Sequence, residues 1–431
     1  MVPDLLDVHN ITDVSPALAE VNPNLRFRGH RYPLVSVTNT IKHSCESLQQ
    51  ELNQVILELE EMAEAQKFIH EFKLFKCIQC GVCTGSCPVS AKAGLNIRQL
   101  MREINLNRRV EIPPEDVLWS CTTCSACEAR CPKELSPYKV ILEMRGLAVE
   151  GGMVSSTVRD ALESVFKHGN PWSRGRAKRS EWEESLDVPE FKKETEFLYY
   201  VGCTPAYDPR GQKTAKALVS IFSSAGVDYG TLGDKETCCG DTVYGMGEKG
   251  LFEMVVEDNT ELFEERGVKS MVTTSPHCFN MFKNRYGNPS FEAQHYTQLL
   301  ATLIDKGKLR FSRSFQKTVT YHDPCFLGRQ NGIYEDPRKV LKAVPGLNFL
   351  ELDRSRERGL CCEGGGGRIL VDIPGERLAE RRIRGAVEVG AEIIATACPF
   401  CLSTLEDAVL TSGLDHSVKV MDIAEIIAKV L

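Results

Sequence analysis

The chain lacks the features that would place it in a membrane or on nucleic acid. No stretch comes near the roughly 20 consecutive apolar residues that a membrane-spanning helix requires. The first residues, MVPDLLDVHNITDV, have neither the basic nor the apolar region of a secretory signal. Lys and Arg number 52 against 59 Asp and Glu, so the net charge is −7 and no broad basic surface is expected. We therefore predict a cytoplasmic chain with no direct transmembrane span and no nucleic-acid partner.

The sequence also lacks the common motifs of nucleotide-binding enzymes and hydrolases. It contains no Walker or GxGxxG pattern for a bound nucleotide or flavin, and no arrangement that predicts a nucleophile–base triad. Its 431 residues are enough for about two to four domains. The 18 cysteines are the unusual feature. In a reducing compartment, clustered cysteines bind metal more often than they form disulfides.

Changes in composition and periodicity divide the chain into five predicted segments. These are an extended arm over 1–41, a helical cysteine-rich module over 42–150, a polar linker over 151–195, and two α/β units over 196–310 and 311–431. Within the module, apolar residues at helical spacing predict a helix from about Ser47 to Phe75 with a packed face.

Two runs of cysteines in the module have the C-x2-C-x2-C-x3-C-P spacing of bacterial ferredoxins. Two-residue gaps let three successive thiolates hold three irons of one cube, and the fourth cysteine, turned away by the proline, reaches the other cluster. We therefore predict two cubane [4Fe–4S] clusters and a role in electron transfer. Their ligands are Cys77, Cys80, Cys83 and Cys131 for one cluster, and Cys121, Cys124, Cys127 and Cys87 for the other. A pair of zinc sites is the alternative, but such sites rarely use four cysteines in one run followed by proline.

The region from about 196 to the end is duplicated. A cysteine after a β-branched run, a Cys-Cys pair and a later cysteine recur at a nearly constant separation of about 120 residues. The second copy has five cysteines, namely Cys325, Cys361, Cys362, Cys398 and Cys401. Five thiolates from three strand ends suit a larger cluster better than one tetrahedral ion. The glycine run over 364–367 fits close approach of backbone to such a group, although a glycine-rich surface turn is the simpler alternative.

The first copy is incomplete. It keeps Cys203, Cys238, Cys239 and Cys278, but Met281 stands where the fifth cysteine would be. A thioether is a weak, neutral ligand, and methionine more often fills a core. The first copy therefore remains open to a further cluster, a zinc ion or no metal.

The order of these motifs resembles the CCG, or cysteine-rich, domain family of heterodisulfide-reductase-like proteins. A two-cluster ferredoxin module followed by two such repeats is similar to the D-type polypeptide of heterodisulfide reductase and to the K-type polypeptide of a sulfite-reductase-linked complex. The stretch YHDPCFLGR over 321–329 is similar to the family's sequence around the first cysteine of a complete repeat. The resemblance covers about 77–405. It implies an α+β multidomain fold, in which a helical two-[4Fe–4S] ferredoxin domain precedes two pseudo-repeated α/β CCG domains.

The resemblance also implies an activity. In that family a complete repeat holds a noncubane [4Fe–4S] cluster with five cysteine ligands, here the five cysteines of the second copy. The implied reaction is reduction or formation of a disulfide or trisulfide, either a carrier-protein trisulfide or a coenzyme M–coenzyme B type heterodisulfide. Implied partners are a membrane cytochrome b-type subunit or other redox subunits, which would hold the chain at the inner face of the membrane.

Three further side chains are candidates near the second copy. His322 precedes Cys325 and is predicted either to donate a proton to a departing thiolate or to cap a strand end. Arg329 and Arg368 are predicted either to bind acidic groups of a substrate or to be solvated surface residues.

A different function fits the cubane clusters equally well. The chain would then be a pure electron-transfer subunit between a flavin dehydrogenase, of the glycolate or glycerol-3-phosphate type, and quinone. A third hypothesis treats both repeats as a scaffold for partners. The five-cysteine repeat favours the catalytic hypothesis, because a relay has no need of a ligand-rich, unusual cluster.

Overall fold

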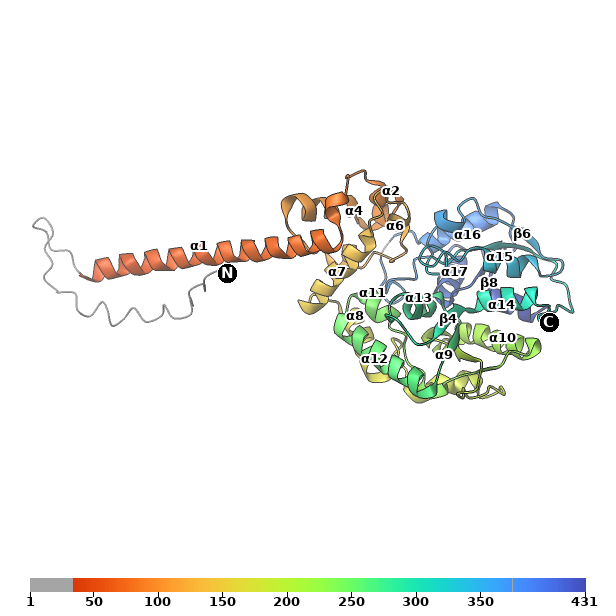
Figure 1. Cartoon of the computed structure of the whole chain (residues 1–431). Coiled ribbons are helices and arrows are strands. Elements are labelled where there is room, and N and C mark those ends of the chain that lie inside the picture. The colour runs from red at the N-terminus through yellow and green to blue at the C-terminus, as the bar shows by residue number, and fades with distance from the viewer. Residues whose placement is uncertain (1–33, 374) are drawn as a thin grey trace, which may run out of the picture. The chain divides into compact units, whose positions relative to one another are not determined.

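The computed structural model describes residues 34–373 and 375–431, with side chains from residue 46 onward (Figure 1). Most of the arm predicted over 1–41 therefore lies outside the described residues. The chain divides into two compact units, 1–64 and 65–431. The long helix α1, Leu34–Glu71, begins in the first unit and ends in the second.

The apolar face of α1 in the first unit is exposed, contrary to the packed face that the sequence predicts. Leu52 is 50% exposed, Leu59 is 59% exposed and Met62 is 52% exposed. Only the end of the helix contributes to a core, where Phe68 and Ile69 are buried in the second unit. Apolar residues at helical spacing predict the helix but do not say what covers its face.

A helical module opens the second unit. Its short elements are η2 (Leu74–Lys76), α2 (Val82–Ser86), α3 (Ser90–Ala93), α4 (Ile97–Arg102), the π-turn η3 (Glu103–Asn107), α5 (Glu115–Leu118) and α6 (Ala126–Ala129). The longer helix α7 (Pro137–Glu150) follows, with Pro137 in its first turn, where a missing N–H costs nothing. Buried Trp119, Ile141 and Met144 belong to the core of this module. The module is helical, as predicted.

Two four-stranded parallel sheets follow. The first has the order β2-β1-β3-β4, and the second has the equivalent order β6-β5-β7-β8. Their strands are β1 (Phe197–Tyr200), β2 (Tyr229–Gly230), β3 (Ser270–Thr273), β4 (Glu292–His295), β5 (Thr318–Tyr321), β6 (Asn348–Leu350), β7 (Ile393–Thr396) and β8 (Lys419–Asp422). In each sheet the second strand in chain order pairs with one side of the first strand, and the third strand pairs with the other side of the first. That switch point places the loops after neighbouring strands around one crevice, where open α/β sheets bind ligands.

Helices connect the parallel strands of both sheets. In the first repeat they are α9 (Cys203–Tyr207), α10 (Pro209–Ala225), α11 (Asp241–Met246), α12 (Lys249–Arg266), α13 (Pro276–Asn284) and α14 (Tyr296–Asp305). In the second repeat they are α15 (Glu335–Lys342), α16 (Leu378–Glu388), α17 (Pro399–Thr411) and α18 (Ile423–Ala428). A short 3-10 turn lies in a loop of each repeat, η5 (Gly233–Lys235) in the first and η6 (Arg356–Arg358) in the second. The mixed fold with two α/β repeats agrees with the sequence prediction.

The two repeats pack on each other reciprocally. Helix α10 of the first packs on α18 of the second, while α14 of the first packs on α15 of the second. Because α10 corresponds to α15 and α14 to α18, the contact has the character of a two-fold interface within one chain. One core cluster contains residues from both repeats, such as Phe222, Tyr296, Val319 and Ile427.

The segment predicted as a linker over 151–195 is folded against the first repeat. It contains α8 (Ser156–His168) and the 3-10 helix η4 (Arg176–Glu183). Arg179 and Trp182 are buried. Among the described helices, none is long and apolar enough to cross a membrane.

The start of α18 carries a buried carboxyl group. Asp422 caps the helix through the backbone N–H of Ala424 and accepts a 2.7 Å hydrogen bond from the Tyr296 hydroxyl of the other repeat. Burial raises the pKa of Asp422 to about 7, although the hydrogen bond from Tyr296 opposes the shift. The folded chain therefore holds a proton that the unfolded chain has released above about pH 4.

We expect Asp422→Asn to remove a pH dependence of stability. Between about pH 4 and pH 7 the wild-type folded state binds more protons than the unfolded state, so its free energy of unfolding falls as pH rises, by up to about 1.4 kcal/mol per pH unit. The asparagine keeps the cap but does not titrate. The melting temperature of the variant relative to wild type should therefore rise between about pH 5 and pH 8. The exposed Asp415→Asn is the control, and an equal pH profile for all three proteins would contradict the assignment.

Candidate metal centres

The outer cysteines of the module line one surface hollow. These are Cys77, Cys80, Cys83 and Cys131, the set that the spacing assigns to one cluster. Cys80 is exposed, and the other three are partly exposed. The loop between them takes left-handed backbone at Gln79 (φ 57°) and Gly81 (φ 78°), which turns successive thiols toward the same hollow.

The inner cysteines form a second group that is mostly buried. Cys121, Cys124 and Cys127 are buried, and Cys87 is partly buried. Burial raises the pKa of Cys87, and the nearby Cys121 and Cys124 raise it further. Burial and the same neighbours raise the pKa of Cys127. Buried thiols this close together become thiolates only beside a positively charged metal group, so the set fits a cluster.

The separation of possible ligand atoms differs between the module and the second repeat. Tetrahedral zinc, with Zn–S distances of about 2.3 Å, needs sulfurs about 3.8 Å apart. Within the described part of the chain, only His322, Cys362 and Cys401 bring three ligand atoms within 4.8 Å of one another. The thiols of the module's four-cysteine sets are therefore spread more widely in this structure than the ligand atoms of that trio.

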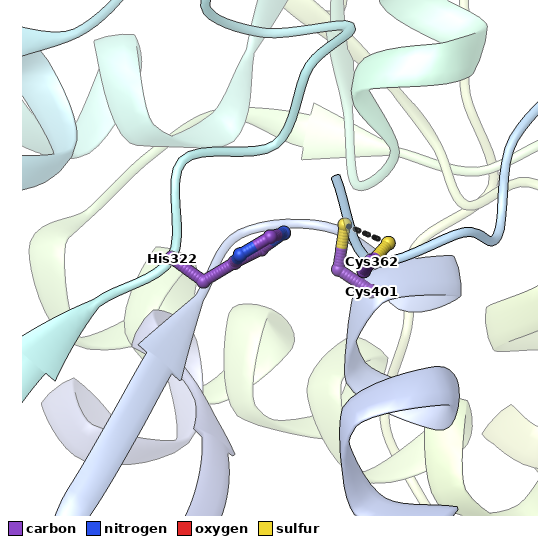
Figure 2. Close-up of side chains that lie close together, drawn as sticks. All are labelled: His322, Cys362 and Cys401. Atoms are coloured by element: carbon purple, nitrogen blue, oxygen red, sulfur yellow. Dashed lines mark hydrogen bonds between the residues drawn. The ribbon is translucent and has the colours of Figure 1, made fainter. Parts of the chain in front are cut away.

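The five cysteines of the second repeat meet at the carboxyl edge of its sheet, and all five are buried. Cys325 follows β5, Cys361 and Cys362 follow β6, and Cys398 and Cys401 lie at the start of α17. The thiol of Cys361 is a hydrogen-bond neighbour of Cys325 and of Cys124 in the module. The Sγ atoms of Cys362 and Cys401 are 3.2 Å apart (Figure 2).

His322 points toward Cys362 and Cys401 from the end of β5 (Figure 2). Its Nδ1 accepts a 3.1 Å hydrogen bond from Nε of Arg382, so Nε2 carries the ring proton on the side of the cysteines. Burial, and then the Arg382 charge, lower the pKa of His322 well below its ordinary value. The side chain is therefore a neutral N–H donor.

The inner cysteines of the module touch the second repeat directly. Cys124 and Cys361 are hydrogen-bond neighbours, and Oγ1 of Thr122 lies 3.6 Å from Sγ of Cys361. Electrons that reach the inner set would therefore have no intervening layer of protein to cross before the five-cysteine set.

Glycines make this close approach possible. A Cβ at Gly366 would lie 2.9 Å from the carbonyl oxygen of Cys121, and one at Gly365 would lie 2.9 Å from that of Thr122. Gly366 also has φ of 62°, where other residues are strained. The glycine run thus lets the second repeat pack against the loop that carries the inner cysteines, a contact that the sequence did not predict.

Arg145 on α7 stabilises this junction with hydrogen bonds. Its guanidinium donates to the carbonyl oxygens of Leu118 (3.1 Å), Cys121 (2.8 Å), Gly245 (2.5 Å) and Gly366 (2.9 Å). These acceptors belong to the module, the first repeat and the second repeat. The side chain is fully buried, so all four bonds are made away from water.

Arg329 and Arg368, which were predicted either to bind a substrate or to be solvated, have different environments. Nε of Arg329 donates to the carbonyl oxygen of Cys124 (2.6 Å), and its Nη1 donates to the carbonyl oxygen of Gly359 (2.7 Å). Arg329 is therefore a second residue, after Arg145, that hydrogen-bonds the module to the second repeat. Arg368 lines a cavity and pairs with Glu363 at 3.1 Å. Nε of Arg368 is buried without a hydrogen-bond partner.

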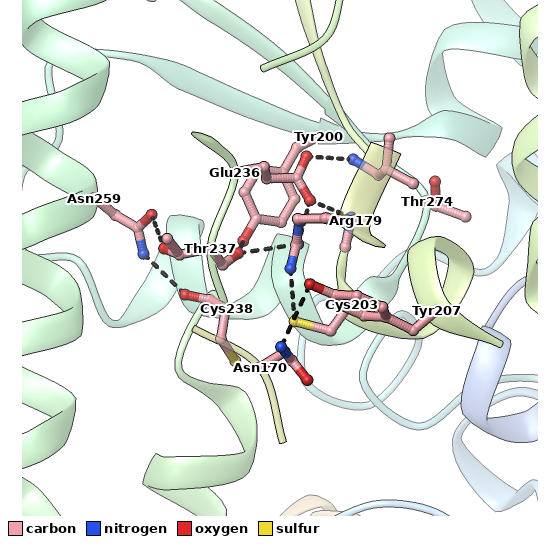
Figure 3. Close-up of polar contacts among 12 residues, drawn as sticks. Asn170, Arg179, Tyr200, Cys203, Tyr207, Glu236, Thr237, Cys238, Asn259 and Thr274 are labelled. Carbon is pink, nitrogen blue, oxygen red and sulfur yellow. Dashed lines mark hydrogen bonds and ion pairs between the residues drawn. The ribbon is translucent and has the colours of Figure 1, made fainter. Parts of the chain in front are cut away.

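The first repeat has its own four-cysteine set. Cys203, Cys238, Cys239 and Cys278 lie around a hollow of about 30 Å³. Arg179 reaches Sγ of Cys203 at 3.5 Å and forms a buried ion pair with Glu236 at 2.5 Å (Figure 3). A Cβ at Gly202 would lie 3.3 Å from Sγ of Cys278. The residues fit a four-thiolate centre with a cation beside it.

Met281 does not supply the missing fifth ligand. It is 1% exposed and belongs to the core cluster that contains Phe282 and Phe291. Its place one turn after Cys278 matches that of Cys401 after Cys398, so the substitution removes a donor from an otherwise equivalent helix start.

His277 bridges the two repeats. Its Nδ1 lies 2.8 Å from Asp241, and its ring stacks on Phe326 of the second repeat at 3.8 Å. Burial opposes its charge, but Asp241 and then Cys398 raise the pKa of His277 to about 10. For Cys398, burial is outweighed by hydrogen bonds from Cys401 and His277, which lower its pKa to about 5. An imidazolium of one repeat therefore faces a thiolate of the other.

A cavity of about 340 Å³ opens beside the second repeat. Cys362 lines it directly, together with apolar Leu370 and Val371 and the cations Arg368 and Arg377. Acidic Glu363, Asp372 and Asp407 lie on the same wall, so the cavity carries both signs of charge. Its volume admits a small thiol or disulfide arm.

Comparison with known proteins agrees with this architecture. The cysteine-rich domain model matches residues 197–283 and 319–406, and the 4Fe-4S dicluster domain model matches residues 73–135. The sheets and the helical module thus define an iron–sulfur electron-transfer protein with two cysteine-rich repeats.

Curated relatives identify the family. The chain is 32% identical over 419 residues to the probable iron-sulfur-binding oxidoreductase FadF of Bacillus subtilis. The match covers 83% of this chain and 59% of FadF. It is 33% identical over 418 residues to the EtfAB:quinone oxidoreductase of Syntrophomonas wolfei, 83% of this chain and 58% of that protein. It is 30% identical over 392 residues to the D-type polypeptide of the dihydromethanophenazine:CoB–CoM heterodisulfide reductase of Methanosarcina barkeri, 83% of this chain and 94% of that polypeptide.

The chain therefore belongs to the family of CCG-domain iron–sulfur oxidoreductases that includes this heterodisulfide reductase polypeptide. It spans a little under three fifths of the length of the first two relatives.

We expect Arg145→Met to destabilise the second unit by at least about 3 kcal/mol. The variant leaves buried carbonyl groups of three segments without their shared cationic donor, and such unmatched groups cost about 1–3 kcal/mol each. Anaerobic denaturant unfolding, followed by the visible absorbance of the clusters, measures the change. Arg102→Met, at an exposed arginine of α4, is the matched control. Equal unfolding midpoints for both variants would show that the junction does not depend on Arg145.

Proposed function

We propose that the second repeat is a redox active site that reduces, or in the reverse direction forms, a disulfide or trisulfide. For a disulfide, two electrons and two protons convert R–S–S–R′ into RSH and R′SH. The electrons come from redox partners through the outer and then the inner cysteines of the module. The substrate is a carrier-protein trisulfide or a heterodisulfide of the coenzyme M–coenzyme B type.

One observation carries this proposal: the cavity of about 340 Å³ opens onto Cys362, a member of the five-cysteine set whose Cys361 contacts the inner cysteine Cys124. A pure relay needs only closely spaced centres. A cavity that reaches a ligand-rich centre supports access of a substrate sulfur. A noncubane cluster held by Cys325, Cys361, Cys362, Cys398 and Cys401 would supply single electrons and bind that sulfur when present.

The chain's own residues position the substrate and offer its sulfur a hydrogen bond. Nε2–H of His322 faces Cys362 and Cys401 and can hydrogen-bond a sulfur there. Arg382 fixes that tautomer by donating to Nδ1. In the cavity, the apolar side chains of Leu370 and Val371 exclude water from the body of a substrate.

The first repeat supports a different role under this proposal. Its hollow is about one tenth of the volume of the cavity, and its helix carries Met281 in place of a fifth cysteine. Four thiolates beside Arg179 suit a further cluster or a zinc ion that holds the repeat together without binding substrate.

The alternative function is the relay between a flavin dehydrogenase, of the glycolate or glycerol-3-phosphate type, and quinone. The printed name of the Syntrophomonas relative, an EtfAB:quinone oxidoreductase, favours it. Membrane partners, such as a cytochrome b-type subunit, fit both functions, and one relative is named a probable membrane-anchored ferredoxin. Under either function we propose a place at the cytoplasmic face of the membrane.

The first test compares Cys401→Ser with Met281→Leu, which changes the matching position of the first repeat. Anaerobically purified Cys401→Ser should lose about 4 of about 12 iron atoms per chain, and the paramagnetic signal that a thiol substrate elicits on oxidation should disappear. Met281→Leu should keep the full iron content and the paramagnetic signal. If wild type contains about 8 iron atoms and shows no thiol response, the catalytic proposal fails and the relay remains.

The second test fills the cavity with Ser403→Trp. Ser403 lines the cavity from α17, so an indole there should lower disulfide turnover at least about tenfold while the clusters are still reduced by a small artificial donor. Thr411→Trp, at an exposed position of the same helix, should turn over like wild type. Unchanged turnover in Ser403→Trp would place the substrate elsewhere.

A further inference from the structure

We infer that the surface around Cys80 is the docking site of an acidic redox protein that exchanges electrons with this chain. The inference rests on the electron path through the outer cysteines of the module. It specifies the place and the chemistry of the partner, neither of which the cysteine pattern provides.

Exposure of the outer centre makes this surface the point where electrons enter. Cys80 is the one exposed cysteine among the described side chains, whereas the cysteines of the inner set and of the second repeat are buried or partly buried. Electron exchange between proteins requires the two centres to approach closely. The thiols outside the outer set reach the described surface only in part, as at Cys87 and Cys203, or through the cavity at Cys362.

Large apolar side chains surround that cysteine. Phe75 is 59% exposed, Ile78 is 58% exposed and Val82 is 39% exposed. Ile78 and Val82 line the hollow of the outer cysteines, and Phe75 lies two residues before Cys77. Single exposed apolar residues are ordinary, but three within eight residues at a redox centre form a contact patch.

The charges around the hollow specify the sign of the partner. Arg98 and Lys133 line it, and none of the described acidic residues does. The exposed cations Lys73 and Lys76 precede Cys77. Two exposed acidic residues, Glu71 and Glu134, are also close in the sequence. The patch is therefore cationic on a chain whose net charge is −7. Such a local field steers a partner whose cofactor edge is ringed by carboxylates, and it accelerates association at low salt.

The size of the patch fits a transient complex. Three apolar side chains and a few charges form a small contact, which is typical of electron-transfer encounters. Fast exchange, rather than tight binding, is the property such a surface provides.

The experiment measures the second-order rate of cluster reduction by reduced flavodoxin, a small acidic redox protein, in stopped flow. Wild type should react more slowly as ionic strength rises. Arg98→Glu/Lys133→Glu should react at least about tenfold more slowly at low salt, and its rate should rise with salt. Lys306→Glu/Lys308→Glu makes the same change of net charge at exposed lysines after α14 and should match wild type.

A second donor separates the docking site from the electron path. Photoreduced deazaflavin, which needs no docking site, should reduce the clusters of all three proteins to the same extent by EPR. Clusters that deazaflavin cannot reduce would overturn the electron path itself. Clusters that it reduces equally, with flavodoxin rates that do not depend on Arg98 and Lys133, would overturn the docking site alone.

Discussion

The arrangement of the redox centres depends on one buried cation. Arg145 donates hydrogen bonds to the carbonyl oxygens of Leu118 and Cys121 in the module, Gly245 in the first repeat and Gly366 in the second. Burial lowers the pKa of Arg145 to about 10, although the nearby Cys121 opposes the shift, so the group stays charged at neutral pH. A buried charge is tolerated only when its donors are matched. Four carbonyl oxygens accept hydrogen bonds from the donors of Arg145. Because these oxygens belong to the module and to both repeats, the need to satisfy Arg145 fixes how the three segments pack together.

The sequence was sufficient for the groups of cysteines and for the class of fold. The C-x2-C-x2-C-x3-C-P runs indicate which thiols belong together because ferredoxin geometry is local. Alternating β-branched and helical stretches indicate parallel α/β repeats. The junction was not predictable in the same way. Arg145 and Gly366 are 221 positions apart, and nothing in the residues near either one indicates that they meet. The cavity at Cys362 and the exposed face of α1 likewise depend on what packs nearby.

The two repeats show how one fold carries two different centres. Their strand orders are equivalent, and their first, paired and later cysteines follow the same strands. The difference comes from one helix position, Met281 against Cys401, and from the loop over 364–372 that borders the cavity. His277 couples them, because its imidazolium belongs to the first repeat while the thiolate of Cys398 belongs to the second. Duplication has thus produced one scaffold whose halves are no longer equivalent.

The reciprocal packing of α10 on α18 and of α14 on α15 has a consequence for cooperativity. Each repeat completes its hydrophobic core with side chains of the other, such as Phe222 and Ile427. Neither repeat alone would keep those side chains from water, at a cost of about 1.5–3 kcal/mol for each large one exposed. The pair should therefore melt as one unit, and evolution has been free to alter the chemistry of one half because the other half preserves its fold.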